Sequence, residues 1–140
     1  MVASLLDRPL VPVANPDDAA TTYEKLRPYF LEQDIDATVV NVIEKAGGAP
    51  DKAGVEQRQE HAEETFDAFE EPAETDGITV DTEVLYGTDI VDAINDAAAE
   101  VDASAIVFVS RGGGRLLDLV SGSVRSRLVA ESDFPVIVLP

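Results

Sequence analysis

The chain alternates short apolar runs with segments of helical periodicity, and this alternation limits its fold more than any other feature. An apolar run of about four to eight residues is typical of a buried strand. Because a strand that follows such a helix returns parallel to the strand before it, the pattern predicts an α/β fold in which helices cover both faces of a parallel sheet. The five expected strands are Arg8–Val13, Ala37–Ile43, Ile78–Leu85, Ala105–Val109 and Val136–Leu139.

Four segments between these strands have apolar residues at helical spacing. The first helix is expected to begin after a cap at Asn15 and to bend or end early at Pro28, because proline removes a hydrogen bond inside a helix. The second is expected to end at Pro72, and the third to begin after a cap at Thr88. The apolar positions that mark the fourth are Val124, Leu128 and Val129.

The charge of the chain excludes several kinds of partner. Its 28 acidic and 10 basic residues give a formal net charge of −18, which disfavours sequence-independent binding to nucleic acid and to anionic lipid. No apolar run is long enough to insert into a membrane, so one cytoplasmic domain over residues 1–140 is expected. The many carboxylates indicate salt adaptation, as in a halophilic archaeon, because salt screens their repulsion. The alternative is an acidic protein from an organism of ordinary salinity.

The sequence offers few groups for catalysis or for metal binding. It contains no cysteine, which excludes disulfides and thiolate metal sites. Its one histidine, His61, lies in a charged helical segment and is expected to be a solvated surface residue. No catalytic residue and no metal-binding residue is therefore assigned.

The clearest functional pattern follows the expected strand Ala105–Val109. Residues 110–127, SRGGGRLLDLVSGSVRSR, hold four of the ten basic residues and offer unobstructed backbone N–H groups at Gly112–Gly114. A helix expected to start near Gly122 would add the partial positive charge of its N-terminus. Ligands of parallel sheets bind at the carboxyl ends of the strands, so the stretch predicts an anion site there. The alternative is a loop whose arginines pair with surface carboxylates.

This stretch matches neither the P-loop nor the dinucleotide-binding fingerprint, but it resembles the glycine motif of the universal stress protein family. That motif is G-x-x-G, nine residues and G-[ST], and here the chain reads V-S-R-G, nine residues and G-S. Gly112, Gly122 and Ser123 match, whereas Val109 stands in place of the first glycine. The resemblance extends over the whole chain, through V-P-V, N-V-I, Y-G-T and the final S-D-F-P-V-I-V-L.

The resemblance implies a five-stranded parallel sheet in the order 3-2-1-4-5, of the adenine nucleotide alpha hydrolase-like class, and a homodimer joined through the last strand. It implies an adenine nucleotide as ligand, either AMP or ATP, the latter with or without Mg²⁺, and at most slow ATP hydrolysis. It puts the base beside the first two strands and the phosphates at the glycine motif. The implied binding residues are Pro12, Val42, Arg111, Gly112, Gly113, Gly122, Ser123, Val124 and Arg125.

Two departures from the family pattern leave a second function open. Ala14 and Asn15 follow the first strand where the family commonly has an acidic residue, and Val109 puts a branched side chain where the family has glycine. With both changes the chain would bind no nucleotide. It would then act as a dimeric interaction or regulatory protein of the same family, which includes domains linked to transporters.

Overall fold

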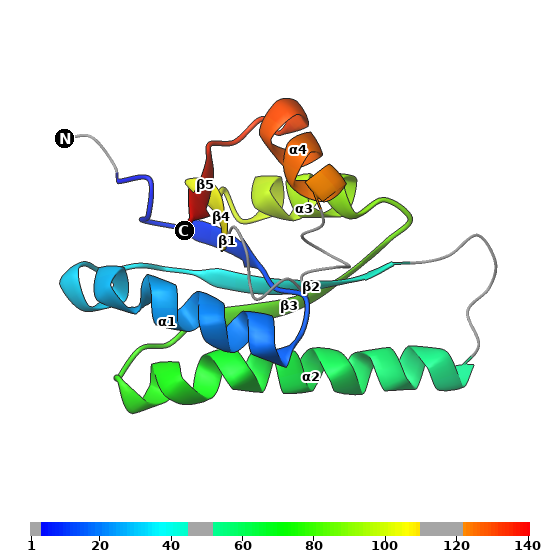
Figure 1. Ribbon diagram of the computed structural model, residues 1–140, viewed down its shortest axis with the longest axis horizontal. Coiled ribbons are helices and arrows are strands. Elements are labelled where there is room, and N and C mark those ends of the chain that lie inside the picture. Colours follow the sequence, from blue (N-terminus) through cyan, green and yellow to red (C-terminus); the bar gives the residue numbers. More distant parts are fainter. Residues whose placement is uncertain (1–3, 45–51, 110–121) are drawn as a thin grey trace.

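Five parallel strands form a single sheet in the order β3-β2-β1-β4-β5 (Figure 1), which is the order that the family resemblance implies. The structure, a computed structural model, describes residues 4–44, 52–109 and 122–140. The strands are β1 (Pro9–Pro12), β2 (Thr38–Glu44), β3 (Asp81–Gly87), β4 (Ala105–Val109) and β5 (Val136–Leu139).

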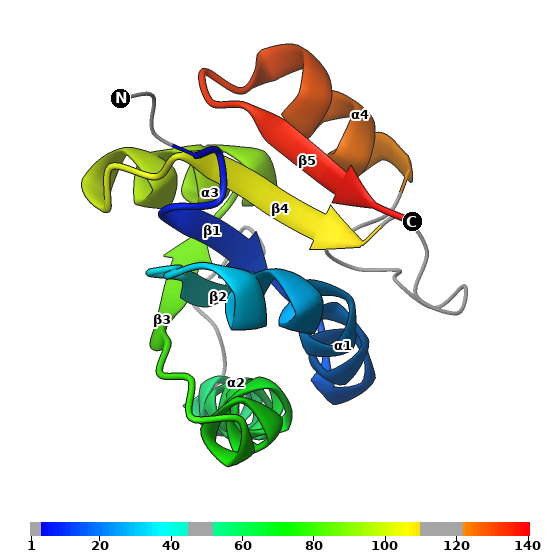
Figure 2. The ribbon, with the colours of Figure 1, turned by 90° about the vertical axis from the view of Figure 1, so that its left-hand side faces the viewer.

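Helices cover both faces of this sheet, and each face has its own apolar core (Figure 2). Two helices pack on one face and two on the other, because the connections on the two sides of β1 run in opposite directions along the sheet. The helices are α1 (Pro16–Glu32) and α2 (Lys52–Thr75) on the first face, and α3 (Ile90–Glu100) and α4 (Gly122–Glu131) on the second.

α2 does not end at Pro72, so that expectation is wrong, and α1 does not end early at Pro28. Pro28 and Pro72 lie inside the helices, each in the last two turns, where one lost backbone hydrogen bond affects a short segment. In both helices a side chain beyond the proline is buried in the same core, Phe30 in α1 and Ala73 in α2. Burial of these anchors outweighs the local preference of proline to end a helix.

Several other boundaries differ from the expected ones by one to three residues, among them the starts of α3 and β3. The cap of α3 is Asp89 instead of Thr88, and its carboxylate accepts a hydrogen bond from a backbone N–H of the first turn. β3 begins at Asp81 instead of Ile78, because the N–H of Ile78 donates to the carbonyl of Ala73 at 2.8 Å and closes the turn after α2.

The central strands are buried on both faces, and successive side chains enter opposite cores. In β4, Val107 and Val109 pack under α1 and α2, whereas Ile106 and Phe108 pack under α3 and α4. In β1, Leu10 likewise belongs to the α3/α4 side. This alternation decides which side chains of the strand ends face each side of the sheet.

A polar contact joins α1 to the end of α2 beside an aromatic cluster. Tyr23 packs edge-on against Phe69, with ring centroids 5.3 Å apart, and its hydroxyl donates to Asp76 at 2.6 Å. Arg27 holds the same carboxylate through Nε at 2.8 Å and Nη2 at 3.3 Å. Burial, followed by the hydrogen bond to Asp76, raises the pKa of Tyr23 from 10.0 to about 12.

We predict that this shift makes stability depend on alkaline pH. The unfolded phenol ionises near pH 10 and the folded one near 12, so the contribution of Tyr23 is complete below pH 10 and is lost as the pH rises through 12. Two units correspond to roughly 2–3 kcal/mol. Urea unfolding between pH 9 and pH 12 should show a steeper loss for wild-type protein than for Tyr23→Phe. Parallel curves would contradict the assignment.

Candidate functional site

The strand order reverses at β1, and the carboxyl ends of β1 and β4 meet at this point. β1 pairs with β2 on one side and with β4 on the other, where Leu10 lies opposite Ile106. The chain leaves β1 toward α1 on one face, and α4, which follows β4 in the sequence, lies on the opposite face (Figure 2). Adjacent connections that diverge in this way leave room for a ligand above the strand ends.

Three of the sequence-predicted binding residues lie in described positions on this edge. Val42, near the end of β2, and Val124, in the first turn of α4, are half-buried against the same core, the one under α3 and α4. Ala14, directly after β1, joins them there. Pro12 is buried in β1, and its alternation with Leu10 turns it toward the same face. We call Pro12, Ala14, Val42 and Val124 the apolar edge.

The other predicted residues are described only in part. The structure gives the backbone of α4 from its first residue but not the side chains of Gly122, Ser123 and Arg125. Arg111, Gly112 and Gly113 lie outside the described residues.

Val109 does not face the apolar edge. Its side chain is 3% exposed and packs under α1 and α2, on the opposite side of the sheet from Val42 and Val124. Its backbone does not adopt the positive φ that favours glycine. Among the described residues other than glycine, the residue with a positive φ is Asp102. The branched side chain therefore lies away from the side on which the apolar edge is exposed.

Hydrogen bonds within the protein hold the loop between β1 and α1. The N–H of Ala14 donates to Oδ2 of Asp18 at 2.8 Å, and the N–H of Asp18 donates to Oδ1 of Asn15 at 2.8 Å. Asn15 therefore caps α1, as predicted, and its side-chain oxygen is occupied. Asn41 donates through Nδ2 to the carbonyls of Val13 at 2.8 Å and Ala14 at 3.4 Å.

Asp18 and Asn41 are the residues at this site that the sequence analysis missed. They are 4% and 5% exposed, and together they satisfy the backbone of the loop. Burial raises the pKa of the Asp18 carboxyl, and the hydrogen bonds from Ala14 and Thr22 oppose that rise. One signal was available, because Asn41 is a polar residue inside the otherwise apolar run VVNVI.

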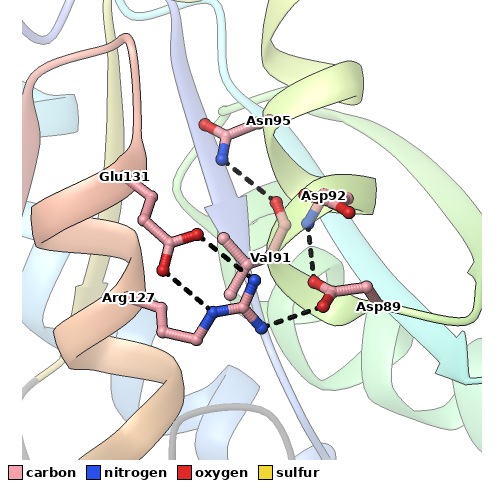
Figure 3. Close-up of polar contacts among 6 residues, drawn as sticks. All are labelled: Asp89, Val91, Asp92, Asn95, Arg127 and Glu131. Atoms are coloured by element: carbon pink, nitrogen blue, oxygen red, sulfur yellow. Dashed lines mark hydrogen bonds and ion pairs between the residues drawn. The ribbon is translucent and has the colours of Figure 1, made fainter.

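Arg127, from the basic stretch, is engaged with carboxylates (Figure 3). Its Nη1 donates to Asp89 at 2.9 Å, and its Nε and Nη2 donate to Glu131 at 3.1 and 3.3 Å. For this arginine the alternative of surface pairing is correct. Arg125 and the remaining two arginines have no described side chains.

Two features are absent from residues 4–44, 52–109 and 122–140. No helix within those ranges is long and apolar enough to cross a membrane. No three side chains of histidine, cysteine, aspartate or glutamate come together there in an arrangement suited to a metal ion.

We predict that Asn41→Asp destabilises the protein at neutral pH. A carboxylate has no hydrogen to donate, so it would leave the carbonyls of Val13 and Ala14 without their donor and add a buried charge, at a cost of at least about 3 kcal/mol. Urea unfolding at pH 7 should show this loss. The deficit relative to wild-type should shrink toward pH 4, because a protonated carboxyl can donate again. A variant as stable as wild-type at pH 7 would contradict the role of Asn41.

Comparison with known proteins identifies relatives over nearly the full length of the chain. A model of the universal stress protein family matches residues 6–140. The universal stress protein UspA from Lactobacillus plantarum superposes with a TM-score of 0.75 at 22% identity, over 99% of this chain and 100% of that one. The universal stress protein from Archaeoglobus fulgidus in complex with dAMP gives 0.63 at 20% identity, over 98% of this chain and 100% of that one.

A third solved structure, a universal stress protein in complex with cAMP, gives a TM-score of 0.60 at 15% identity over 94% of this chain and 96% of that one. No curated protein matches the chain in sequence. The solved structures share the fold, and the family model covers both the strand order reversal and the apolar edge. The chain belongs to the universal stress protein family.

Proposed function

We propose that the protein binds an adenine nucleotide above the carboxyl ends of β1, β2 and β4, on the α3/α4 side of the sheet. The observation that carries the proposal is the apolar edge, whose half-buried members Ala14, Val42 and Val124 gather at the strand order reversal. Relatives that share this fold have been solved with dAMP and with cAMP, which supports the same ligand class here.

The proposed site divides the ligand between two kinds of surface. The purine would lie on the half-buried Val42 beside Pro12, which is buried, since an apolar surface suits a flat ring. The phosphates would lie at the N-terminus of α4, where the positive end of the helix dipole favours anions. Further phosphate contacts are proposed at the residues outside the described part or with undescribed side chains, namely Arg111, Gly112, Gly113, Gly122, Ser123 and Arg125.

The proposed role is regulatory binding with at most slow ATP hydrolysis. Asp18 contacts the apolar edge through the N–H of Ala14, and both of its carboxylate oxygens already accept hydrogen bonds, from Ala14 and Thr22. A general base must reach the proton that it removes, and Asp18 is committed to the loop. Mg²⁺, where it accompanies ATP, would be held by the phosphates.

We predict that ATP and AMP raise the melting temperature of the protein. A ligand at about 100 times its Kd adds roughly 2.7 kcal/mol, which for a domain of this size is a shift of about 5–10 °C. Thermal unfolding should be followed with ATP, AMP, adenosine and inorganic phosphate, in molar salt that screens the net charge of −18. No shift with any adenine compound at millimolar concentration would contradict nucleotide binding.

A matched pair of variants locates the site in the same experiment. Val42→Phe adds a ring to the surface proposed for the purine, so the shift with ATP should fall. Val129→Phe adds the same bulk at a position on α4 that is 61% exposed and lies outside both cores, so it should leave the shift unchanged. Equal thermal shifts in the two variants would mean that the ligand does not lie on Val42.

A second candidate function is a dimeric interaction or regulatory protein that binds no nucleotide. The hydrogen bonds of the β1–α1 loop favour it, because Ala14 and Asn15 are satisfied by Asp18 and Asn41 and offer a ligand few directional contacts. A protein of this kind, including one that regulates a transporter, would give no thermal shift with adenine compounds. The melting experiment therefore separates the two functions.

We also propose that the protein forms a homodimer through β5. This strand lies at the edge of the sheet, pairing with β4 and with no other strand of the described chain, and its Val138 is 42% exposed. An unpaired edge with exposed apolar side chains is suited to pairing with another strand.

The prediction is that light scattering gives twice the chain mass of 14.9 kDa for wild-type protein. Val138→Lys should give the single-chain mass, because a lysine on an edge strand opposes pairing. Val129→Lys, on an exposed position of α4, is the control and should stay dimeric. A monomeric wild-type protein, or a dimeric Val138→Lys variant, would overturn the proposed interface.

A further inference from the structure

Arg127 joins the two helices that cover the proposed ligand face (Figure 3). Its guanidinium lies between α4 and the start of α3, and each of its three nitrogens donates to a carboxylate. The pair with Glu131 lies within α4, four residues apart, and is bidentate. The contact with Asp89 is the one that crosses to the other helix.

Asp89 is itself fixed in place. Its Oδ1 accepts from the N–H of Asp92 at 3.0 Å and so starts α3, which leaves Oδ2 for Arg127 at 2.9 Å. The backbone hydrogen bond and then the guanidinium hold the pKa of this carboxyl below its ordinary value. Just before it, a Cβ added to Gly87 would lie 3.3 Å from Cβ of Ala93, so the end of β3 packs closely on α3.

Few apolar contacts fix the orientation of α4. Among its described side chains, Leu128 is buried, Val124 is half-buried, and Ser126, Val129, Ala130 and Glu131 are exposed. Two apolar side chains on one stripe hold a helix against the sheet but fix its rotation about its axis less firmly than a wider apolar face would. A polar contact beside that stripe restricts the rotation, and Arg127 lies three residues after Val124, on the same side of the helix.

We propose that Arg127 is a positioning residue for phosphate binding and makes no contact with the phosphates itself. Through Asp89 it sets the rotation of α4 and therefore the direction of the N–H groups at the start of that helix. This inference rests on the proposed function, because it concerns the phosphate end of the same ligand. It also gives Arg127, one of the four arginines of the basic stretch, a structural role in the fold.

The test compares ATP with adenosine, which lacks phosphates, by calorimetric titration in the same molar salt. Arg127→Met should raise the Kd for ATP about tenfold, an effect within the range of interaction energies between pairs of residues that contact each other, as Arg127 and Asp89 do. It should change the Kd for adenosine less than about twofold. A general loss of structure would weaken the binding of both ligands together.

Arg27→Met is the matched control. Arg27 makes a similar contact between helices, through Asp76, on the α1/α2 side of the sheet. Its loss should leave both Kd values unchanged. If Arg27→Met weakened ATP binding as Arg127→Met does, or if Arg127→Met left the ratio of the two Kd values unchanged, the positioning role would be overturned.

Asp89→Asn separates positioning from direct contact. Asparagine still caps α3 but removes the ion pair, so positioning predicts weaker ATP binding, with no further loss when Arg127→Met is added. Tighter ATP binding in Asp89→Asn would mean that the released guanidinium binds phosphate directly, which overturns the proposal. Wild-type protein that binds neither ATP nor AMP overturns the proposed function as well, whereas wild-type protein that binds ATP with an affinity that Arg127→Met leaves unchanged overturns this inference alone.

Discussion

The pairing of β1 with β2 on one side and β4 on the other determines where this protein can hold a ligand. β1 is buried throughout, and the strand order reverses at its junction with β4. The helices that follow these two strands lie on opposite faces, so their carboxyl ends are not closed by a common connection. The apolar edge is a consequence of this arrangement, because the pleat of β1 and β2 and the first turn of α4 bring its members to one side.

The polar groups around that edge serve the fold first. In the described part of the chain every buried side-chain nitrogen or oxygen has a hydrogen-bond partner, and Asp18 and Asn41 hold the backbone beside the strand end. On the α3/α4 face, Arg127 and Asp89 connect α4 to α3. In the proposed site, apolar surface and the N-terminus of α4 recognise the ligand, a combination suited to a flat base that carries phosphates.

The sequence pattern predicts the positions of the strands better than helix ends or side-chain partners, and the order of the strands follows from the family resemblance. β4 and β5 have the predicted bounds because every residue in them is apolar. Pro28 and Pro72 are poor guides to the helix ends, because the helices continue so as to bury Phe30 and Ala73, and this burial is a tertiary effect. The direction of Val109 depends on the pleat of β4, and the partner of Arg127 lies 38 residues away, so neither follows from local pattern. Salt adaptation stays a prediction from composition.

A crystal structure of the protein grown with ATP tests the central claim most directly. The account predicts the purine against Val42 and the phosphates at the first turn of α4, on the α3/α4 side of the sheet. It also predicts that Arg127 keeps its contact with Asp89 and that Val109 stays buried on the other side. Nucleotide bound on the α1/α2 side, or an apolar edge that remains empty at saturating ATP, would contradict the account.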